Sequence, residues 1–249
     1  MIKADGMIKH FGDQIAVNAV SFSLEKGEVL GFLGPNGAGK STTMRMLAGC
    51  LDPDAGSALI EGHDPARQRR AAQSLLGYLP EGAPAYPTMT PRSFVRFHLR
   101  ARGFRGAALN EACERALDRA NLGEAAQKRI GQLSKGYKRR AALAAAIAHD
   151  PPVLILDEPT DGLDPNQKDG VRAMIGEMAR DKAIIVSTHL LEEVNALCTR
   201  TIVIAGGVIQ IDTSPQALSQ ISPEGTIAAS FRQLTTRQQA ETLNAEPHR

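Results

Sequence analysis

Short apolar runs alternate with helical patterns along most of the chain. Val29–Leu33, Val153–Leu156 and Ala183–Val186 have the length and composition of strands buried on both faces of a sheet. Helices are predicted after the first two of these runs, over residues 40–47 and 166–180. Strands that alternate with helices in this way predict an α/β domain with a mostly parallel sheet and right-handed crossovers.

Two other stretches carry the patterns of antiparallel strands. Apolar and polar side chains alternate over residues 20–24 and precede a turn at 25–27, which predicts a half-buried strand and a hairpin. Residues 201–211, which turn at two consecutive glycines, predict a second hairpin as the last regular part of the core. We therefore expect an N-terminal antiparallel β part beside the parallel sheet.

The middle of the chain is helical in pattern. Thr90 is a good N-cap and Pro91 suits the first helical position, and further helices are predicted over 109–121 and 135–148. We interpret residues of about 82–148 as a helical subdomain inserted into the α/β core.

The pattern weakens and turns polar beyond Ser222, so we expect a domain at 1–221 and a short C-terminal tail at 222–249. No apolar run approaches the ~18 residues that a membrane-spanning helix needs, and residues 1–5 begin neither a secretion signal nor a transit peptide. The chain is therefore expected to be soluble by itself, and a membrane can enter its function only through another polypeptide.

Composition narrows the classes of protein that fit this pattern. With 249 residues, 43% of them hydrophobic, the chain can bury a substantial core. A formal net charge of +2 gives no signal of nucleic-acid binding, so we expect no nucleic-acid partner. The odd number and wide spacing of Cys50, Cys113 and Cys198 favour reduced thiols over a disulfide or zinc framework.

A glycine-rich loop follows the first buried strand and precedes a helix. The loop consists of Gly34, Pro35, Asn36, Gly37, Ala38, Gly39, Lys40 and Ser41. In this spacing the backbone N–H groups and the helix N-terminus converge on phosphate oxygens. We expect Lys40 to reach the β- and γ-phosphates, Ser41 to ligate Mg²⁺ and Thr42 to donate to a phosphate. The alternative is a chance glycine-rich turn, which the strand and helix on either side disfavour.

Two carboxylates end the second buried strand. Asp157 is suited to hold Mg²⁺, and Glu158 to orient and deprotonate an attacking water, with alternation along the strand sending their side chains different ways. His189, after the third buried strand, can hydrogen-bond a γ-phosphate. Alone, the carboxylate pair is more often a solvated turn and the histidine a surface residue; the phosphate loop in the same chain favours the catalytic interpretation.

Leu133, Ser134, Lys135, Gly136 and Tyr137 open a predicted helix and resemble the signature of ATP-binding-cassette (ABC) transporter subunits, usually leucine, serine, glycine, glycine, glutamine. The departures are at Lys135 and Tyr137. Ser134 and Gly136 keep the serine and the second glycine at a helix N-terminus, which suits γ-phosphate binding. The resemblance spans about residues 2–218.

Other family motifs follow in the expected order. Gly162, Leu163 and Asp164 resemble the loop that crosses the dimer interface, and Phe11 is similar to the aromatic residue that stacks on adenine. Glu81 stands where the family generally has a glutamine near the metal, and its carboxylate can still ligate a hard cation. Together with Lys135 and Tyr137, it resembles the branch that serves ABC-2 type exporters.

The resemblance implies a P-loop NTPase fold of the ABC ATPase type that uses ATP and Mg²⁺, with Ser41, Glu81 and Asp157 at the metal. It implies a head-to-tail dimer with a second copy or a homologous ATPase subunit, in which the phosphate loop and Glu158 of one subunit face Ser134 of the other. It also implies a separate ABC-2 type transmembrane permease, export, and a peripheral position at the cytoplasmic face of the inner membrane.

A permease segment is expected to dock between Glu81 and about Arg105, where several aromatic residues cluster in the sequence. These are Tyr86, Phe94, Phe97 and Phe104. Packing within the helical subdomain is the alternative, because Phe94 and Phe97 have ordinary helical spacing.

Two other functions compete with transport. A soluble cassette protein acting on DNA or ribosomes usually carries two cassettes or a long coiled coil, whereas the segment between Lys40 and Asp157 has room for a helical subdomain only. A small P-loop kinase or GTPase has no reason to keep the Leu133–Tyr137 element.

Overall fold

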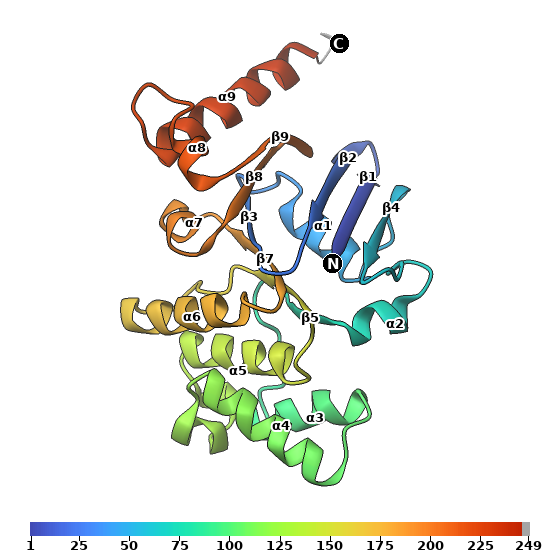
Figure 1. The fold of residues 1–249 in the computed structure, drawn as a ribbon, viewed down its shortest axis with the longest axis vertical. Coiled ribbons are helices and arrows are strands. Elements are labelled where there is room, and N and C mark those ends of the chain that lie inside the picture. The colour runs from blue at the N-terminus through green and yellow to red at the C-terminus, as the bar shows by residue number, and fades with distance from the viewer. Residues whose placement is uncertain (246–249) are drawn as a thin grey trace.

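The computed structural model describes the backbone of residues 1–245 and the side chains of residues 1–236. Two β-sheets share a core, and a helical subdomain is attached at one end of the molecule (Figure 1). The strands are β1 (Ile2–Phe11), β2 (Gln14–Leu24), β3 (Val29–Leu33), β4 (Ala55–Ile60), β5 (Leu76–Leu79), β6 (Val153–Asp157), β7 (Ala183–Thr188), β8 (Arg200–Ala205) and β9 (Val208–Thr213). The α-helices are α1 (Lys40–Leu47), α2 (Arg69–Ser74), α3 (Pro91–Ala101), α4 (Gly106–Arg119), α5 (Lys135–Ile147), α6 (Pro165–Met178), α7 (Leu191–Leu197), α8 (Pro215–Ser219) and α9 (Ile227–Ala245).

The larger sheet has the strand order β5-β6-β7-β3-β8-β9 and is parallel except for β9. Its central strands β3, β6 and β7 are buried along their whole length, as expected for strands covered on both faces. The predicted α/β fold with a mostly parallel sheet is confirmed. The predicted hairpin at 201–211 is also present, as β8 and β9.

The smaller sheet is antiparallel, with the order β2-β1-β4. The prediction of a hairpin at 25–27 was wrong. That turn leads from β2 in the small sheet to β3 in the large sheet, so the two strands do not pair. The N-terminal hairpin is formed instead by β1 and β2 and turns at Gly12 and Asp13. An apolar strand such as β3 is stable only where both its faces are covered, which excludes it from the half-exposed sheet.

The main core lies between the two sheets and includes α1. The ring centroids of Phe22 on β2 and Phe32 on β3 are 5.7 Å apart in this core. A second cluster, formed with α5 and α6, covers the other face of the large sheet. The phosphate loop is thus held between two rigid layers, because α1 packs beneath the small sheet.

The helical subdomain has a core of its own. The Thr90 side chain accepts a hydrogen bond from the backbone N–H of Ser93, so α3 begins as predicted with Pro91 in its first turn. Helix α4 begins at Gly106, three residues before the predicted start. Ser134 caps α5 by accepting from the N–H of Tyr137.

The C-terminal tail contains a helix that the weak sequence pattern did not predict. Helix α9 packs on β8, with Ile227, Ala229 and Ser230 buried. The backbone N–H of Ser222 donates to Ser230 Oγ at 3.0 Å, which ties the start of the tail to this helix. Residues 246–249 of the predicted tail lie outside the described residues.

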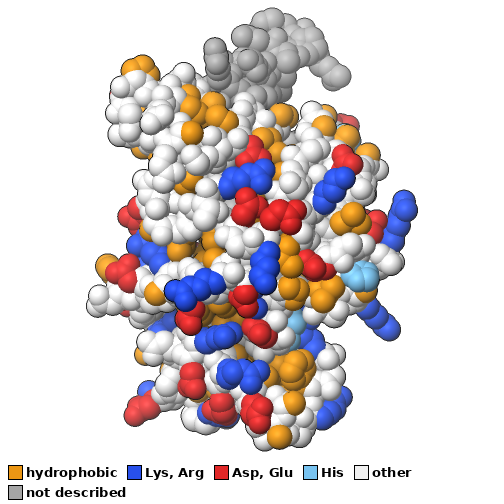
Figure 2. Space-filling view, viewed as in Figure 1, with side chains coloured by type: hydrophobic (Ala, Val, Ile, Leu, Met, Phe, Trp, Pro, Cys, Tyr) orange, Lys and Arg blue, Asp and Glu red, His pale blue; other side chains and the backbone are white. Residues whose placement is uncertain are grey.

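Charged side chains of both signs are interspersed over the face drawn in Figure 2. A mixed surface of this kind creates no extended field of a single sign. Among the residues that the structure describes, no helix is long and apolar enough to cross a membrane.

Candidate functional site

Four neighbouring strands of the large sheet end at one edge, and the predicted site residues follow them. Glu81 comes after β5, Glu158 after β6, His189 after β7 and the phosphate loop after β3. In open α/β sheets, the carboxyl ends of the strands are where ligands bind. The strand order therefore brings together residues from distant parts of the chain.

A cleft of about 410 Å³ opens at this edge. It is lined by Phe11, Gln14, Ala16, Asn36, Gly37, Gly39, Lys40, Ser41, Thr42, Glu81, Asp157 and Glu158. Most of the predicted nucleotide and metal residues thus meet in one place. Gln14 and Ala16 were missed, because they lie on the small sheet and carry no recognisable signal in the sequence.

The phosphate loop is closed around its own lysine. Lys40 Nζ donates to the carbonyl oxygens of Gly34 at 2.6 Å and Pro35 at 3.0 Å. Burial lowers the pKa of Lys40, and the carboxylates of Glu158, Asp157 and Glu81 oppose that shift. The ammonium therefore lies in an electronegative cleft that a phosphate and a cation together can neutralise.

Gly39 turns the loop into α1 with a φ of 101°, a conformation that side-chain-bearing residues rarely adopt. A Cβ at this position would lie 2.4 Å from the carbonyl oxygen of Ala16. Loop and small sheet thus touch through backbone atoms. Three predicted loop residues, Gly34, Pro35 and Ala38, do not line the cleft, and Ala38 is buried.

Both carboxylates at the end of β6 face the cleft, contrary to the alternation that we expected. Glu158 leaves the strand with a φ of 52°, which redirects its side chain. Asp157 is 1% exposed, and its Oδ2 has no hydrogen-bond partner. Glu81 Oε2 lies 3.5 Å from Ser41 Oγ. The unpaired Asp157 oxygen shares the cleft with the Ser41 hydroxyl and the Glu81 carboxylate, and hard divalent cations prefer oxygen ligands of these kinds.

Glu158 is paired with His189. The Oε1 of Glu158 lies 2.8 Å from the Nδ1 of His189. Burial raises the pKa of Glu158, whereas the hydrogen bond and charge of His189 act in the opposite direction. A carboxylate with a raised pKa that faces a phosphate cleft is suited to accept a proton from water.

A buried carboxylate that sequence analysis missed holds the loops after β6 and β7 together. Glu193, in the first turn of α7, accepts hydrogen bonds from Thr160 and, at 2.9 Å, from Thr188. Burial raises the pKa of Glu193. Because Thr160 follows Glu158 and Thr188 precedes His189, this network fixes the pair. Its only sequence signal is an acidic residue in a helix first turn, which is common.

The signature residues lie elsewhere in the same chain and do not line the cleft. Lys135, Gly136 and Tyr137 form the first turn of α5, and Ser134 precedes them. A Cβ on Gly136 would lie 3.1 Å from Leu163, and the Lys135 side chain covers Gly162. Asp164 then caps α6 through Gln167 N. The signature is thus packed on the predicted interface loop.

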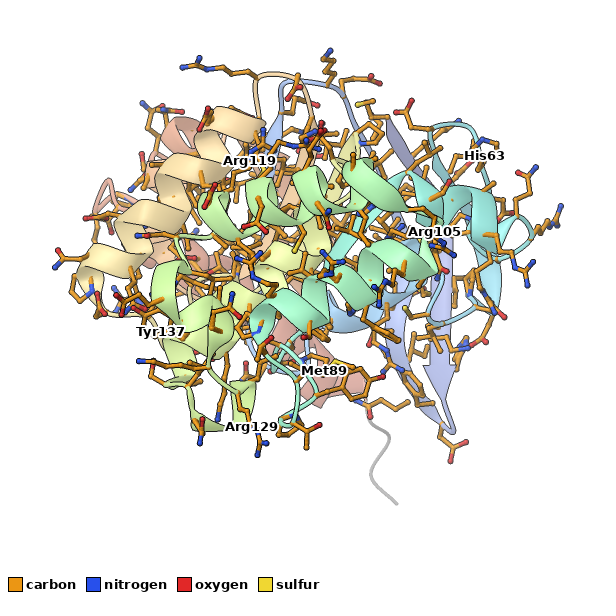
Figure 3. All side chains as sticks on the ribbon, turned by 90° about the horizontal axis from the view of Figure 1, so that it is seen from below. His63, Met89, Arg105, Arg119, Arg129 and Tyr137 are labelled. Carbon is orange, nitrogen blue, oxygen red and sulfur yellow. The ribbon has the colours of Figure 1, made fainter. Side chains whose placement is uncertain are left out.

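Tyr137 lies on an edge of the helical subdomain. In Figure 3, which views the molecule from below, Tyr137, Met89 and Arg129 lie along one side and Arg119 along the other. The guanidinium of Arg140 is 4.1 Å from the Tyr137 ring centroid, so the ring is held by stacking.

The predicted aromatic cluster divides between core and surface. Phe94 is buried in the helical subdomain, whereas Tyr86 and Phe97 are exposed and meet edge to face at 5.8 Å. Phe104 lines a separate groove of about 590 Å³ between the α/β core and α3. The groove is lined by Ala48, Cys50, Arg70, Gln73, Ser74, Leu76, Tyr78, His98, Ala101, Arg102, Phe104 and His149.

Comparison with known proteins gives one consistent result. A family model described as ABC transporter matches residues 17–161. The Nod factor export ATP-binding protein I of Burkholderia lata is 39% identical over 214 residues, which cover 84% of this chain and 69% of that protein. The probable multidrug ABC transporter ATP-binding protein YbhF of Escherichia coli is 35% identical over 94% of this chain and 41% of that protein.

Solved structures with the same fold also exist. A structure described as the ATP-binding subunit of an ABC transporter superposes with a TM-score of 0.85 at 23% identity, covering 94% of this chain and 99% of that one. A dimeric ATP-binding cassette with bound ADP and Pi superposes with a TM-score of 0.79 at 23% identity, covering 86% of this chain and 98% of that one. At these identities the likeness shows the fold.

Proposed function

The chain belongs to the ABC transporter family of ATP-binding subunits, and from this premise we propose that its cleft hydrolyses Mg-ATP to drive a separate ABC-2 type permease in export. The observation that carries the proposal is the meeting of Lys40, Ser41, Asp157 and Glu158 in one cleft. Relatives named as export and multidrug ATP-binding proteins support export over an action on DNA or ribosomes.

Nucleotide binding is assigned to the phosphate loop and Phe11. The loop N–H groups bind the phosphates and Lys40 exchanges its bonds to Gly34 and Pro35 for bonds to phosphate oxygens. Thr42 donates to a phosphate. Phe11 lines the cleft and is 47% exposed, with Lys9 Nζ 6.0 Å from its ring centroid, and its ring is proposed to stack on the base.

Glu158 is proposed as the general base and His189 as the residue that holds it. The 2.8 Å contact between them orients the carboxylate toward the cleft, and His189 then contacts the γ-phosphate from the same position. Ser41, Glu81 and Asp157 are proposed to hold Mg²⁺, which supplies charge neutralisation at the phosphates.

The site is proposed to be completed by a second subunit, either another copy or a homologue. Ser134 and Gly136 are at a helix N-terminus outside the cleft of their own chain, which suits them to a nucleotide held by a partner. Gly162, Leu163 and Asp164 then cross the interface beside them.

The permease is proposed to dock in the groove between the α/β core and α3, with Tyr86 and Phe97 as a nearby exposed contact. Arg70, Arg102, His98 and His149 line this groove without a carboxylate among its lining residues. Burial and the charge of Arg102 lower the pKa of His149 to about 4, so further positive charge is unfavourable there. The proposal places the protein peripherally at the cytoplasmic membrane face.

The test is ATP turnover and dimer formation by the purified chain. Glu158→Gln is expected to lower kcat by roughly 10²- to 10⁴-fold and to give an ATP-dependent dimer in size-exclusion chromatography. Glu177→Gln, an exposed carboxamide substitution on α6, serves as the matched control. Unchanged hydrolysis by Glu158→Gln would remove the assigned base, and a monomer under every nucleotide condition would refute the composite site.

A further inference from the structure

Asp161 lies in the loop between Glu158 and Asp164. Its carboxylate forms ion pairs with two basic side chains of α5. Its Oδ2 is 2.9 Å from Lys135 Nζ and 3.4 Å from a guanidinium nitrogen of Arg139. The hydrogen bond from Lys135 is the main reason that the pKa of Asp161 is below its usual value. The contact is therefore ionic at neutral pH.

The two cations differ in their freedom to move. The Arg139 side chain is 3% exposed and also donates to the Asp157 carbonyl oxygen at 3.4 Å, so it is a fixed anchor at the end of β6. The Lys135 side chain is 70% exposed at the tip of α5. Of the two basic residues, Lys135 is thus the one whose side chain a nucleotide or a second subunit can reach.

The lysine stem adds a packing contact to the ion pair. Gly162 has a φ of 74°, and a Cβ there would lie 2.5 Å from Lys135 Cδ. A larger residue would displace the lysine. The sequence thus places a long side chain on α5 and leaves room for it on the facing loop.

The loop transmits this contact to Glu158. The N–H of Asp161 donates to the carbonyl oxygen of Glu158 at 3.1 Å, closing a turn that Glu158 begins with a positive φ. A shift of the Asp161 carboxylate therefore moves the backbone of the residue assigned as the base.

We propose that Lys135 is a positioning residue that, through Asp161, couples the signature turn of a subunit to the Glu158 of that same subunit. The inference rests on the proposed function, in which Ser134 and Glu158 of one chain serve two different nucleotides. The ion pair then links the two sites of a dimer, so that nucleotide bound at one signature adjusts the base at the other site.

The test uses steady-state ATPase assays of the full chain with Lys135→Met, which keeps an apolar stem and removes the charge. Exposed ion pairs are worth up to about 1 kcal/mol, so kcat is expected to fall about two- to fivefold, with the Hill coefficient for ATP moving toward 1. Lys135→Arg is expected to restore both. Lys128→Met, on the exposed surface of the same subdomain, is the matched control.

A double-mutant cycle identifies the partner. If Lys135 acts through Asp161, adding Lys135→Met to Asp161→Asn changes kcat less than it does in the wild-type chain. If the fold-changes in kcat of Lys135→Met and Asp161→Asn simply multiply in the double mutant, the proposal is overturned. It is also overturned if Lys135→Met has the same kcat and Hill coefficient as Lys128→Met. A change in KM alone would also contradict the proposal, because it would indicate that Lys135 contacts the nucleotide directly. Failure of the wild-type chain to hydrolyse ATP would refute the proposed function and is a separate result.

Discussion

Glu158, which lines the cleft, forms a carboxylate–imidazole pair with His189, in which Oε1 and Nδ1 are 2.8 Å apart. Each residue follows a different parallel strand, and the pair exists because β6 and β7 are neighbours in the sheet. The contact lowers the pKa of the assigned base against the larger, raising effect of burial, and the first prediction depends on it.

His189→Ala is expected to shift the acid limb of the kcat/KM pH profile to higher pH. A general base works only when deprotonated, so activity is lost as pH falls through the pKa of Glu158. Burial already raises that pKa, and His189 opposes it more strongly than Lys40 does, so removing the imidazole takes away the larger of the two lowering effects. His63→Ala, on the small-sheet side of the molecule, is the control. A limb that stays in place or moves to lower pH would contradict the pairing.

Gly39→Ala is expected to weaken ATP binding roughly tenfold or more, measured by calorimetric titration. The methyl group meets the Ala16 carbonyl, and the φ of 101° is strained for alanine, so the loop must shift. Gly176→Ala in α6 provides the comparison, since a Cβ there has nothing within 4 Å. That variant should bind ATP normally and be equally or more stable. Equal binding by both variants would show that the loop tolerates the displacement.

Phe11→Ala is expected to raise the KM for ATP about two- to tenfold, because ring stacking contributes about 0.5–1.5 kcal/mol. Phe11→Tyr keeps a π face and should leave KM near the wild-type value. Ile15→Ala, an equally exposed apolar residue of the same hairpin, controls for lost surface area. If Phe11→Ala and Ile15→Ala behave alike, adenine does not stack on Phe11.

Arg70→Glu is expected to reduce recovery of the chain with its permease from detergent-solubilised membranes, while ATPase activity of the isolated chain is unchanged. The substitution reverses a charge on the groove between core and α3 and spares the cleft. Arg67→Glu changes an arginine three residues away whose side chain is 88% exposed and outside the groove. Equal recovery of the two variants would place the docking surface elsewhere.

Much of the fold follows from the sequence because its strongest patterns are local. The apolar strands, the capped helix at Thr90 and the phosphate loop each have their cause within a few residues. Helix α9 was missed because the sequence beyond Ser222 is mostly polar, and the buried residues that the structure describes on this helix, Ile227, Ala229 and Ser230, form too short a pattern to indicate a helix.

The sequence predicts the site residues that belong to motifs of recognisable chemistry and spacing. It does not predict the residues whose positions depend on tertiary contacts. The common location of Lys40, Asp157 and Glu158 in one cleft could be predicted from their places at or after the ends of strands. The positive φ of Glu158 and the buried contacts of Glu193 could not, because both depend on how the loops after β6 and β7 meet. Pairing between distant residues leaves no periodic trace in the sequence.

The separation of Ser134 from the cleft of its own chain has a genetic consequence. In the proposed dimer, a mixed pair of one Ser134→Ala subunit and one Glu158→Gln subunit is expected to carry both defects at the same nucleotide, while the other nucleotide meets only wild-type groups. Two inactive alleles would thereby complement each other and recover turnover at one of the two positions. Two alleles that both alter Glu158 would recover none.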